Sequence, residues 1–168
     1  MGLRNLTMQL INLFSGILCA RFRSVAIFPL PGPVKAEENL TRFIFESNTT
    51  KKNQLKTQSF RPRKIDKQLS VYRTGNLSRE IILRIGHCFI EKRRLDGKLL
   101  LGMVDLPANA ISQVNQGIFL KRTLLPHPRH ANIHFPPNNS PVDNERWNSI
   151  AKALIEKSNK PSFISTSE

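Results

Sequence analysis

Acidic residues, cysteines and long apolar runs are scarce in this chain of 168 residues. It contains 12 Asp and Glu against 26 Lys and Arg, and two cysteines, Cys19 and Cys88. Two cysteines are too few for a framework of several disulfides or for a four-cysteine zinc site. No uncharged apolar run reaches the roughly 18 residues of a membrane span. We therefore expect a cytoplasmic protein that does not cross a membrane.

Several catalytic and cofactor-binding motifs are also missing. The sequence has no glycine-rich phosphate loop and no Gly-x-Ser-x-Gly nucleophile turn. Its aspartates are scattered along the chain, which argues against the paired carboxylates of metal-dependent nucleases. The histidine spacing near residue 130 suits zinc only on a helix, and the prolines there exclude a helix. We therefore expect no metal and no cofactor.

What the chain does contain is positive charge, and this charge is concentrated. The formal net charge is +14, and residues 40–100 hold 15 basic and five acidic residues. A dense basic region attracts polyanions, above all nucleic acid. No helix-turn-helix pattern is present, which favours RNA or a nucleoprotein over a specific DNA site. The alternative is a non-enzymatic subunit whose basic face binds an acidic protein partner.

Composition divides the chain into four parts. Apolar residues at 3–4 spacing make residues 1–28 an amphipathic or signal-like segment, which need not belong to the fold. Prolines make residues 29–39 a stiff linker. Residues 40–158 form one domain, and the polar residues 159–168 are a frayed tail.

The domain has the pattern of an α+β fold. Strands are predicted over residues 40–46, 69–73, 118–125 and 131–135, with a loop at 47–59. Ser78 caps a short helix that Gly86 ends, Pro107 opens a second helix, and Pro141 opens a third. Residues 87–95 and 98–106 are predicted to form a central hairpin around Asp96-Gly97. The result is a mostly antiparallel sheet covered by two or three helices.

The basic region supplies the candidate nucleic-acid contacts. An extended basic element follows Phe60, and a basic run precedes the predicted hairpin turn. We predict phosphate contacts from Arg61, Arg63, Lys64, Lys67, Arg93 and Arg94. Aromatic residues are 7% of the chain and are not interleaved with basic ones elsewhere, which argues against a broad stacking platform.

A histidine-rich segment is the candidate for catalysis. If residues 130–135 form a strand, His130, Asn132 and His134 share one face. With Arg129, the two histidines would serve a metal-independent ribonuclease of toxin or defence type. The alternative is the polar outer face of an amphipathic strand.

Arg73 is a candidate anion-binding residue, because it ends a strand just before a helix N-terminus. In the alternative, Arg73 forms an ion pair, for example with Glu80 or Asp66.

Four short motifs resemble those of a group of small bacterial proteins. They are a Ser-Val-Tyr-Arg strand, a Leu-Ser-x-Glu-Ile helix start, a Gly-x-Val-Asp-Leu hairpin end and a Pro-Arg-His-Ala-Asn-Ile strand. Here they lie at residues 70–73, 77–81, 102–106 and 128–133. The resemblance implies one compact domain from about residue 40 and brings no activity with it.

Overall fold

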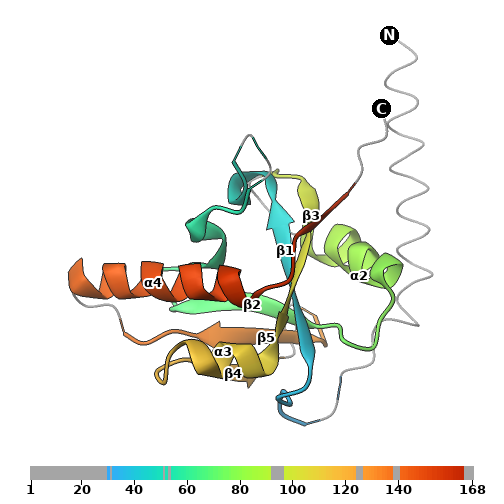
Figure 1. Ribbon diagram of the computed structural model, residues 1–168. Helices are drawn as coiled ribbons and strands as arrows, with labels where there is room; N and C mark the ends of the chain where they lie inside the picture. Colours follow the sequence, from blue (N-terminus) through green and yellow to red (C-terminus); the bar gives the residue numbers. More distant parts are fainter. Residues whose placement is uncertain are drawn as a thin grey trace.

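A computed structural model describes residues 30, 32–50, 52, 54–91, 97–123, 127–137 and 141–164. Within these ranges, six strands form one antiparallel sheet in the order β4-β5-β2-β1-β3-β6, and three α-helices pack against it (Figure 1). The expected α+β class is confirmed. The amphipathic or signal-like segment 1–28, Arg93 and Arg94 lie outside the described residues.

The strands are short and the longest helix is the last. The strands are β1 (Asn39–Phe45), β2 (Gln68–Arg73), β3 (Leu100–Pro107), β4 (Phe119–Arg122), β5 (His130–His134) and β6 (Ser162–Phe163). The α-helices are α2 (Arg79–Ile85), α3 (Ala108–Val114) and α4 (Pro141–Lys157). Two 3₁₀ turns, η1 (Glu46–Asn48) and η2 (Thr57–Phe60), overlap the two ends of the predicted loop 47–59, and a π-helical segment, η3 (Gly86–Ile90), extends α2.

Each face of the sheet has its own apolar cluster. Alternate residues such as Leu40, Val71 and Ile133 pack with Trp147 and Leu154 on the side that α4 covers, called here the α4 face. The intervening residues include Phe43, Tyr72 and Met103 and pack with Ile82 and Ile85 on the opposite side, the α2 face. Figure 1 shows α4 and α2 on opposite sides of β1 and β3.

The start of α2 follows the prediction, and its end does not. Ser78 caps the helix by accepting a hydrogen bond from the Ile81 backbone N–H at 3.4 Å. Gly86, predicted to end the helix, is itself helical, and the chain continues as η3 to Ile90. A Cβ atom at Gly86 would stand 2.6 Å from Leu100 and 2.8 Å from Phe43. The glycine therefore permits close packing of helix on sheet.

The predicted central hairpin is wrong. Its first arm, residues 87–95, is helical as far as the described residues extend, although Gly97 does adopt the positive φ of +64° expected at an Asp-Gly turn. Its second arm becomes β3, which pairs with β1 along the whole length of β1, from Asn39↔Pro107 to Phe45↔Leu100. This long-range pairing places Val104 and Leu106 of β3 in the α4-face cluster and Leu100 and Met103 in the α2-face cluster.

The predicted frayed tail is also wrong in part. Residues 162–163 form β6, which pairs with Gly102 and Met103 of β3. The Ile164 backbone N–H then donates to the Leu101 carbonyl at 2.7 Å, and the Asn159 N–H donates to the Asp105 carbonyl at 2.8 Å. The tail residues 165–168 lie outside the described residues.

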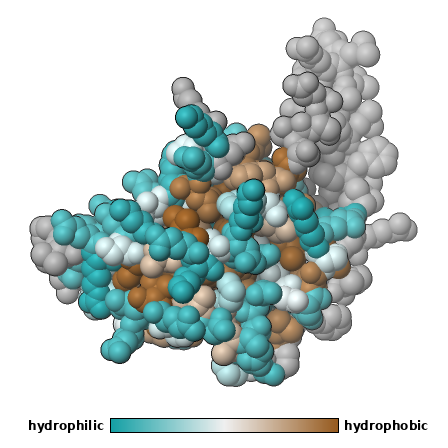
Figure 2. Space-filling model, in the orientation of Figure 1, coloured by the Kyte–Doolittle hydropathy of each residue, from teal (hydrophilic) through white to brown (hydrophobic). Residues whose placement is uncertain are grey.

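The helices found in the described part of the chain are all too short or too polar to cross a bilayer. Hydrophilic side chains cover most of the face seen in Figure 2, with smaller hydrophobic areas between them.

Gly102→Ala should detach β6 from the sheet. The added Cβ would lie 2.3 Å from the Ser162 carbonyl oxygen, closer than any real contact allows. Hydrogen exchange of the Ile164 amide should accelerate by roughly tenfold or more, because its hydrogen bond to Leu101 opens with the strand. Unchanged protection of that amide would contradict the pairing of β6 with β3.

Candidate nucleic-acid interface

A tight loop in front of β2 carries the predicted phosphate contacts that the structure describes. Within this basic loop (residues 61–67), the Lys67 N–H donates to the Arg63 carbonyl at 2.9 Å. The Lys67 carbonyl in turn accepts from the Phe135 N–H at 3.0 Å, which ties the loop to the end of β5. Lys67 has a φ of +56°, which is uncommon for a residue other than glycine. The loop therefore has one defined shape.

The strands next to this loop diverge. β2 pairs with β1 only through Leu40 and Thr41, near the start of β1. Beyond that point the Arg42 guanidinium lies between the strands, where Nη1 donates to the Ser70 carbonyl at 2.9 Å. Its Nε donates to the Ser59 carbonyl at 3.3 Å. Arg42 thus satisfies a β2 carbonyl that a full-length partner strand would have bound.

A pocket of about 530 Å³ opens where β1 and β2 diverge, and the basic loop forms part of its wall. Four cationic side chains line it: Arg42, Arg61, Arg63 and Lys64. The rings of Phe43, Phe45 and Tyr72 also line it and belong to the buried cluster of the α2 face. None of its described lining residues is a carboxylate, although Arg63 is paired with Asp66 of the same loop, so cations outnumber anions around the pocket.

The cations of the basic loop differ in how far they are already engaged. Arg61 Nη2 donates to Asn144 of α4 at 3.0 Å, and its guanidinium lies 6.0 Å from the Trp147 ring centre. Arg63 forms an ion pair with Asp66, which is a weak interaction because the Arg63 side chain is 69% exposed. Lys64 is exposed and has no hydrogen bond or ion pair with the described residues. Arg63 and Lys64 are therefore the cations best placed to meet a phosphate.

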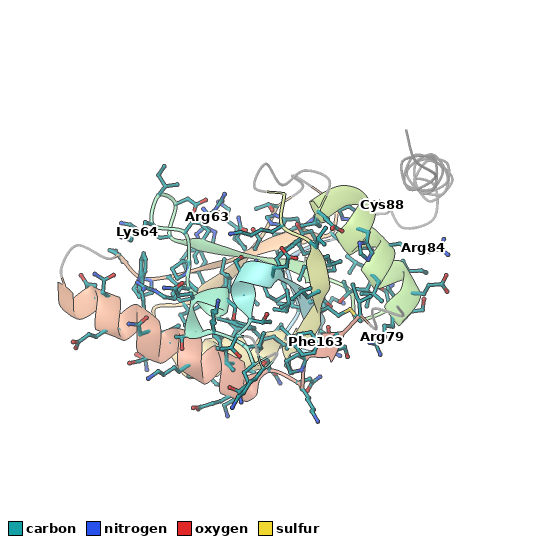
Figure 3. The ribbon with its side chains drawn as sticks, turned by 90° about the horizontal axis from the view of Figure 1, so that it is seen from above. Arg63, Lys64, Arg79, Arg84, Cys88 and Phe163 are labelled. Carbon is teal, nitrogen blue, oxygen red and sulfur yellow. The ribbon has the colours of Figure 1, made fainter. Side chains whose placement is uncertain are left out.

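Other basic residues lie elsewhere. Figure 3 places Arg63 and Lys64 at the opposite side of the molecule from Arg79 and Arg84 of α2. Lys67 belongs to the basic loop but does not line the pocket. The basic residues of the 40–100 region are thus divided between different sides of the molecule.

Arg42 is a residue of the pocket that the sequence pattern alone did not identify. The alternation of β1 places it on the same face as Leu40 and Ile44, both fully buried. A charged residue among core positions needs hydrogen-bonding partners, and this feature of the sequence could have identified Arg42. Ser70 and Tyr72, alternate residues of β2, both line the pocket.

The histidine row has the predicted alternation in a different setting. Ala131 and Ile133 are fully buried in the α4-face core, and His130, Asn132 and His134 point to the other side. β5 is not an edge strand, because it lies between β4 and β2. His130 and Asn132 are 4% and 7% exposed, so the row is mostly covered.

This geometry does not support the predicted catalytic roles. The His130 ring Nδ1 is hydrogen-bonded to the Thr123 hydroxyl, and Arg129, 5% exposed, donates to the Arg73 carbonyl at 3.1 Å and to Asn76 Oδ1 at 2.8 Å. Burial, together with the charge of Arg73, lowers the pKa of Arg129. His134 stacks on Phe119 with ring centres 4.6 Å apart. A ribonuclease needs an acid, a base and a cation that reach the phosphate together. Because His130 and Arg129 are buried and His134 is stacked on Phe119, these three groups do not meet that requirement.

Arg73 is a structural residue and not an exposed anion site. Its guanidinium is 2% exposed and donates to both carboxylate oxygens of Glu38, at 2.7 and 2.5 Å. Its remaining donors bind the carbonyls of Leu30, Gly32 and Pro33 at 3.0 to 3.2 Å. The ion-pair alternative is therefore correct in kind, with Glu38 as the partner in place of Glu80 or Asp66. Arg73 thus helps to hold the described part of the predicted linker against the domain, together with the hydrogen bonds from the Ala108 and Asn109 N–H groups to the carbonyls of Glu38 and Ala36.

Among the described residues, no group of three or more His, Cys, Asp or Glu side chains is arranged to hold a metal ion. No family model, curated protein or solved structure matches this chain.

Glu38→Gln should destabilise the protein in a pH-dependent way. Burial alone would raise the pKa of Glu38, but hydrogen bonds from Arg73 and the Lys35 N–H and the charge of Arg73 hold it below 4.5. The native state therefore prefers the ionised carboxylate, and its contribution is complete above about pH 5 and is lost as the pH falls. At neutral pH the variant should lose about 2–4 kcal/mol of unfolding free energy in urea titrations.

The matched control is Glu37→Gln, which removes the same charge from an exposed neighbour. It should leave the unfolding free energy nearly unchanged. The difference in unfolding free energy between the wild type and Glu38→Gln should become smaller as the pH is lowered. Equal unfolding free energies of the two variants at pH 7 would show that the Arg73–Glu38 ion pair does not stabilise the fold.

Lys121→Ala should raise the pKa of His134. Burial lowers this pKa below 6.5, the charge of Lys121 lowers it further, and the charge of Asp66 opposes both. Removing Lys121 leaves burial in place, so the pKa should rise but stay below 6.5 in an NMR titration of the ring protons. Lys152→Ala, an exposed change in α4, should not move it.

Proposed function

We propose that this protein binds nucleic acid, with RNA preferred over DNA, through the basic loop and the pocket beside it. The observation that carries the proposal is the gathering of Arg42, Arg61, Arg63 and Lys64 around one pocket with no carboxylate among its described lining residues. Phosphate groups are the abundant anions that such a cluster would meet in a cell.

The shape of the basic loop supports binding by pre-organisation. Phe60, fully buried at the end of η2, and the engaged Arg61 attach the start of the loop to the α4 side of the molecule. Its other end is fixed by the hydrogen bond from the Phe135 N–H to the Lys67 carbonyl. Arg63 and Lys64 then lose less conformational freedom on binding than they would on a free tail.

The proposal is binding and not cleavage. The groups that would transfer protons, His130 and His134, are respectively buried and stacked on Phe119, and neither lines the basic pocket. α2 and α3, seven residues each, are separated by β3, so they do not form a helix-turn-helix unit. Because α2 and α3 do not form a helix-turn-helix unit, we favour RNA or an unpaired strand over recognition of the DNA major groove.

The double variant Arg63→Ala/Lys64→Ala should weaken binding and flatten its salt dependence. Each lost phosphate contact on a single strand reduces the slope of log K against log salt by about 0.7, so the pair should reduce it by about 1.4. Fluorescence anisotropy of a labelled RNA at several salt concentrations, with the full chain, measures both effects.

The matched control is Lys152→Ala/Lys157→Ala, which removes two exposed charges of α4 that do not line the pocket. This control should change the slope of log K against log salt much less than Arg63→Ala/Lys64→Ala does. Equal effects of the two double variants would mean that the binding is diffuse and that the basic loop is not the interface. If the wild-type chain bound no nucleic acid at low salt, an acidic protein partner for the basic face would replace this proposal.

A further inference from the structure

We infer that the pocket between β1 and β2 accepts one unpaired nucleotide, with its base inside and its phosphate on the basic loop. This inference rests on the proposed function and names its ligand class: a nucleotide unit of a single strand. A free nucleotide shares the same chemistry, and the experiment below separates the two sources.

The first step is the size and position of the pocket. A volume of about 530 Å³ lies in the range of pockets that hold small ligands. A base within a duplex is stacked and paired, so it cannot enter such a pocket without leaving the helix. A pocket that takes a base therefore selects single strands.

The second step is the polar lining, which has the donors and acceptors that a base edge requires. Gln58 is exposed, and its amide makes no hydrogen bond with the described residues. Asn48 uses its Oδ1 to accept from the Phe45 N–H at 2.9 Å, which leaves its NH₂ group for a ligand. Gln68 likewise uses its Oε1 on Asn132 and keeps its NH₂ group. Three amides thus converge on one pocket.

The third step is the apolar floor. Phe43 and Tyr72 pack with ring centres 5.0 Å apart, and Phe45 lies in the same cluster. These three rings are 2–4% exposed, so they form a floor against which a base would pack and not an open stacking platform. A buried apolar surface below and amides at the sides suit a flat heterocycle with a polar edge.

The fourth step is the arrangement of charge around the floor. Arg63 and Lys64 project from the basic loop, which is exposed, and Arg42 lies deeper, on the carbonyl of Ser70. No described lining residue is a carboxylate, so the phosphate of an inserted nucleotide would meet Lys64 directly and Arg63 in competition with Asp66. The neighbouring phosphates of a strand would lie outside the pocket and add to the salt dependence.

The experiment measures binding of the full chain to three labelled RNAs of one length: an intact single strand, the same strand with abasic sites, and its duplex. The intact single strand should bind roughly tenfold tighter than the abasic strand, because base contacts are lost while the phosphates remain. The duplex should also bind more weakly than the intact strand. Mononucleotides are added as competitors. Displacement at millimolar concentration assigns free nucleotides to the pocket as well, and no displacement restricts the ligand to strands.

Gln58→Ala tests the pocket itself, since this exposed residue has no role in packing. It should reduce the preference for the intact over the abasic strand to within about twofold and leave the salt slope unchanged. Lys152→Ala should change neither quantity. Equal affinity for intact and abasic strands, with normal salt dependence, would overturn this inference and leave the proposed function standing. No binding to any of the three RNAs would overturn both.

Discussion

The buried guanidinium of Arg73 fixes the point at which β1 and β2 join. It ends β2 opposite Leu40 of β1, and it binds Glu38 and three carbonyls of the segment that leads into β1. A buried arginine is stable only when its charge and all its donors are satisfied, so this end of the sheet has one arrangement. Arg129, also buried, donates to the Arg73 carbonyl and depends on the same arrangement. From this fixed end the two strands diverge.

The divergence of β1 and β2 creates the candidate site. If the two strands had paired along their length, the space that Arg42 and the pocket occupy would be filled by ladder hydrogen bonds. Instead, Arg42 satisfies the Ser70 carbonyl, and the basic loop encloses the opening from the side. One structural feature therefore explains both the position of the pocket and the presence of a charged residue among core positions. It also brings cations and aromatic rings to the wall of one pocket, a combination that suits a nucleotide.

The site was only partly predictable because the sequence reports residue types and not their neighbours. Arg61, Arg63 and Lys64 were identified as a basic element, and the structure gathers them around the pocket. Arg42 was missed, since its role depends on a carbonyl of β2 that is distant in sequence. The histidine row was identified as polar residues sharing one face, but an alternating pattern does not reveal that β5 lies inside the sheet and that His130 is covered.

The sequence by itself determined the α+β class, the N-cap at Ser78, the start of α4 at Pro141 and the concentration of charge in residues 40–100. These depend on periodicity, capping and composition, which act over a few residues. Only the tertiary structure decided that β3 pairs with β1, that residues 162–163 join the sheet, and that Arg73 binds Glu38 and the carbonyls of Leu30, Gly32 and Pro33. The reason is that long-range strand pairing and the burial of charge are selected by the whole core, and its free energy exceeds that of any single turn signal.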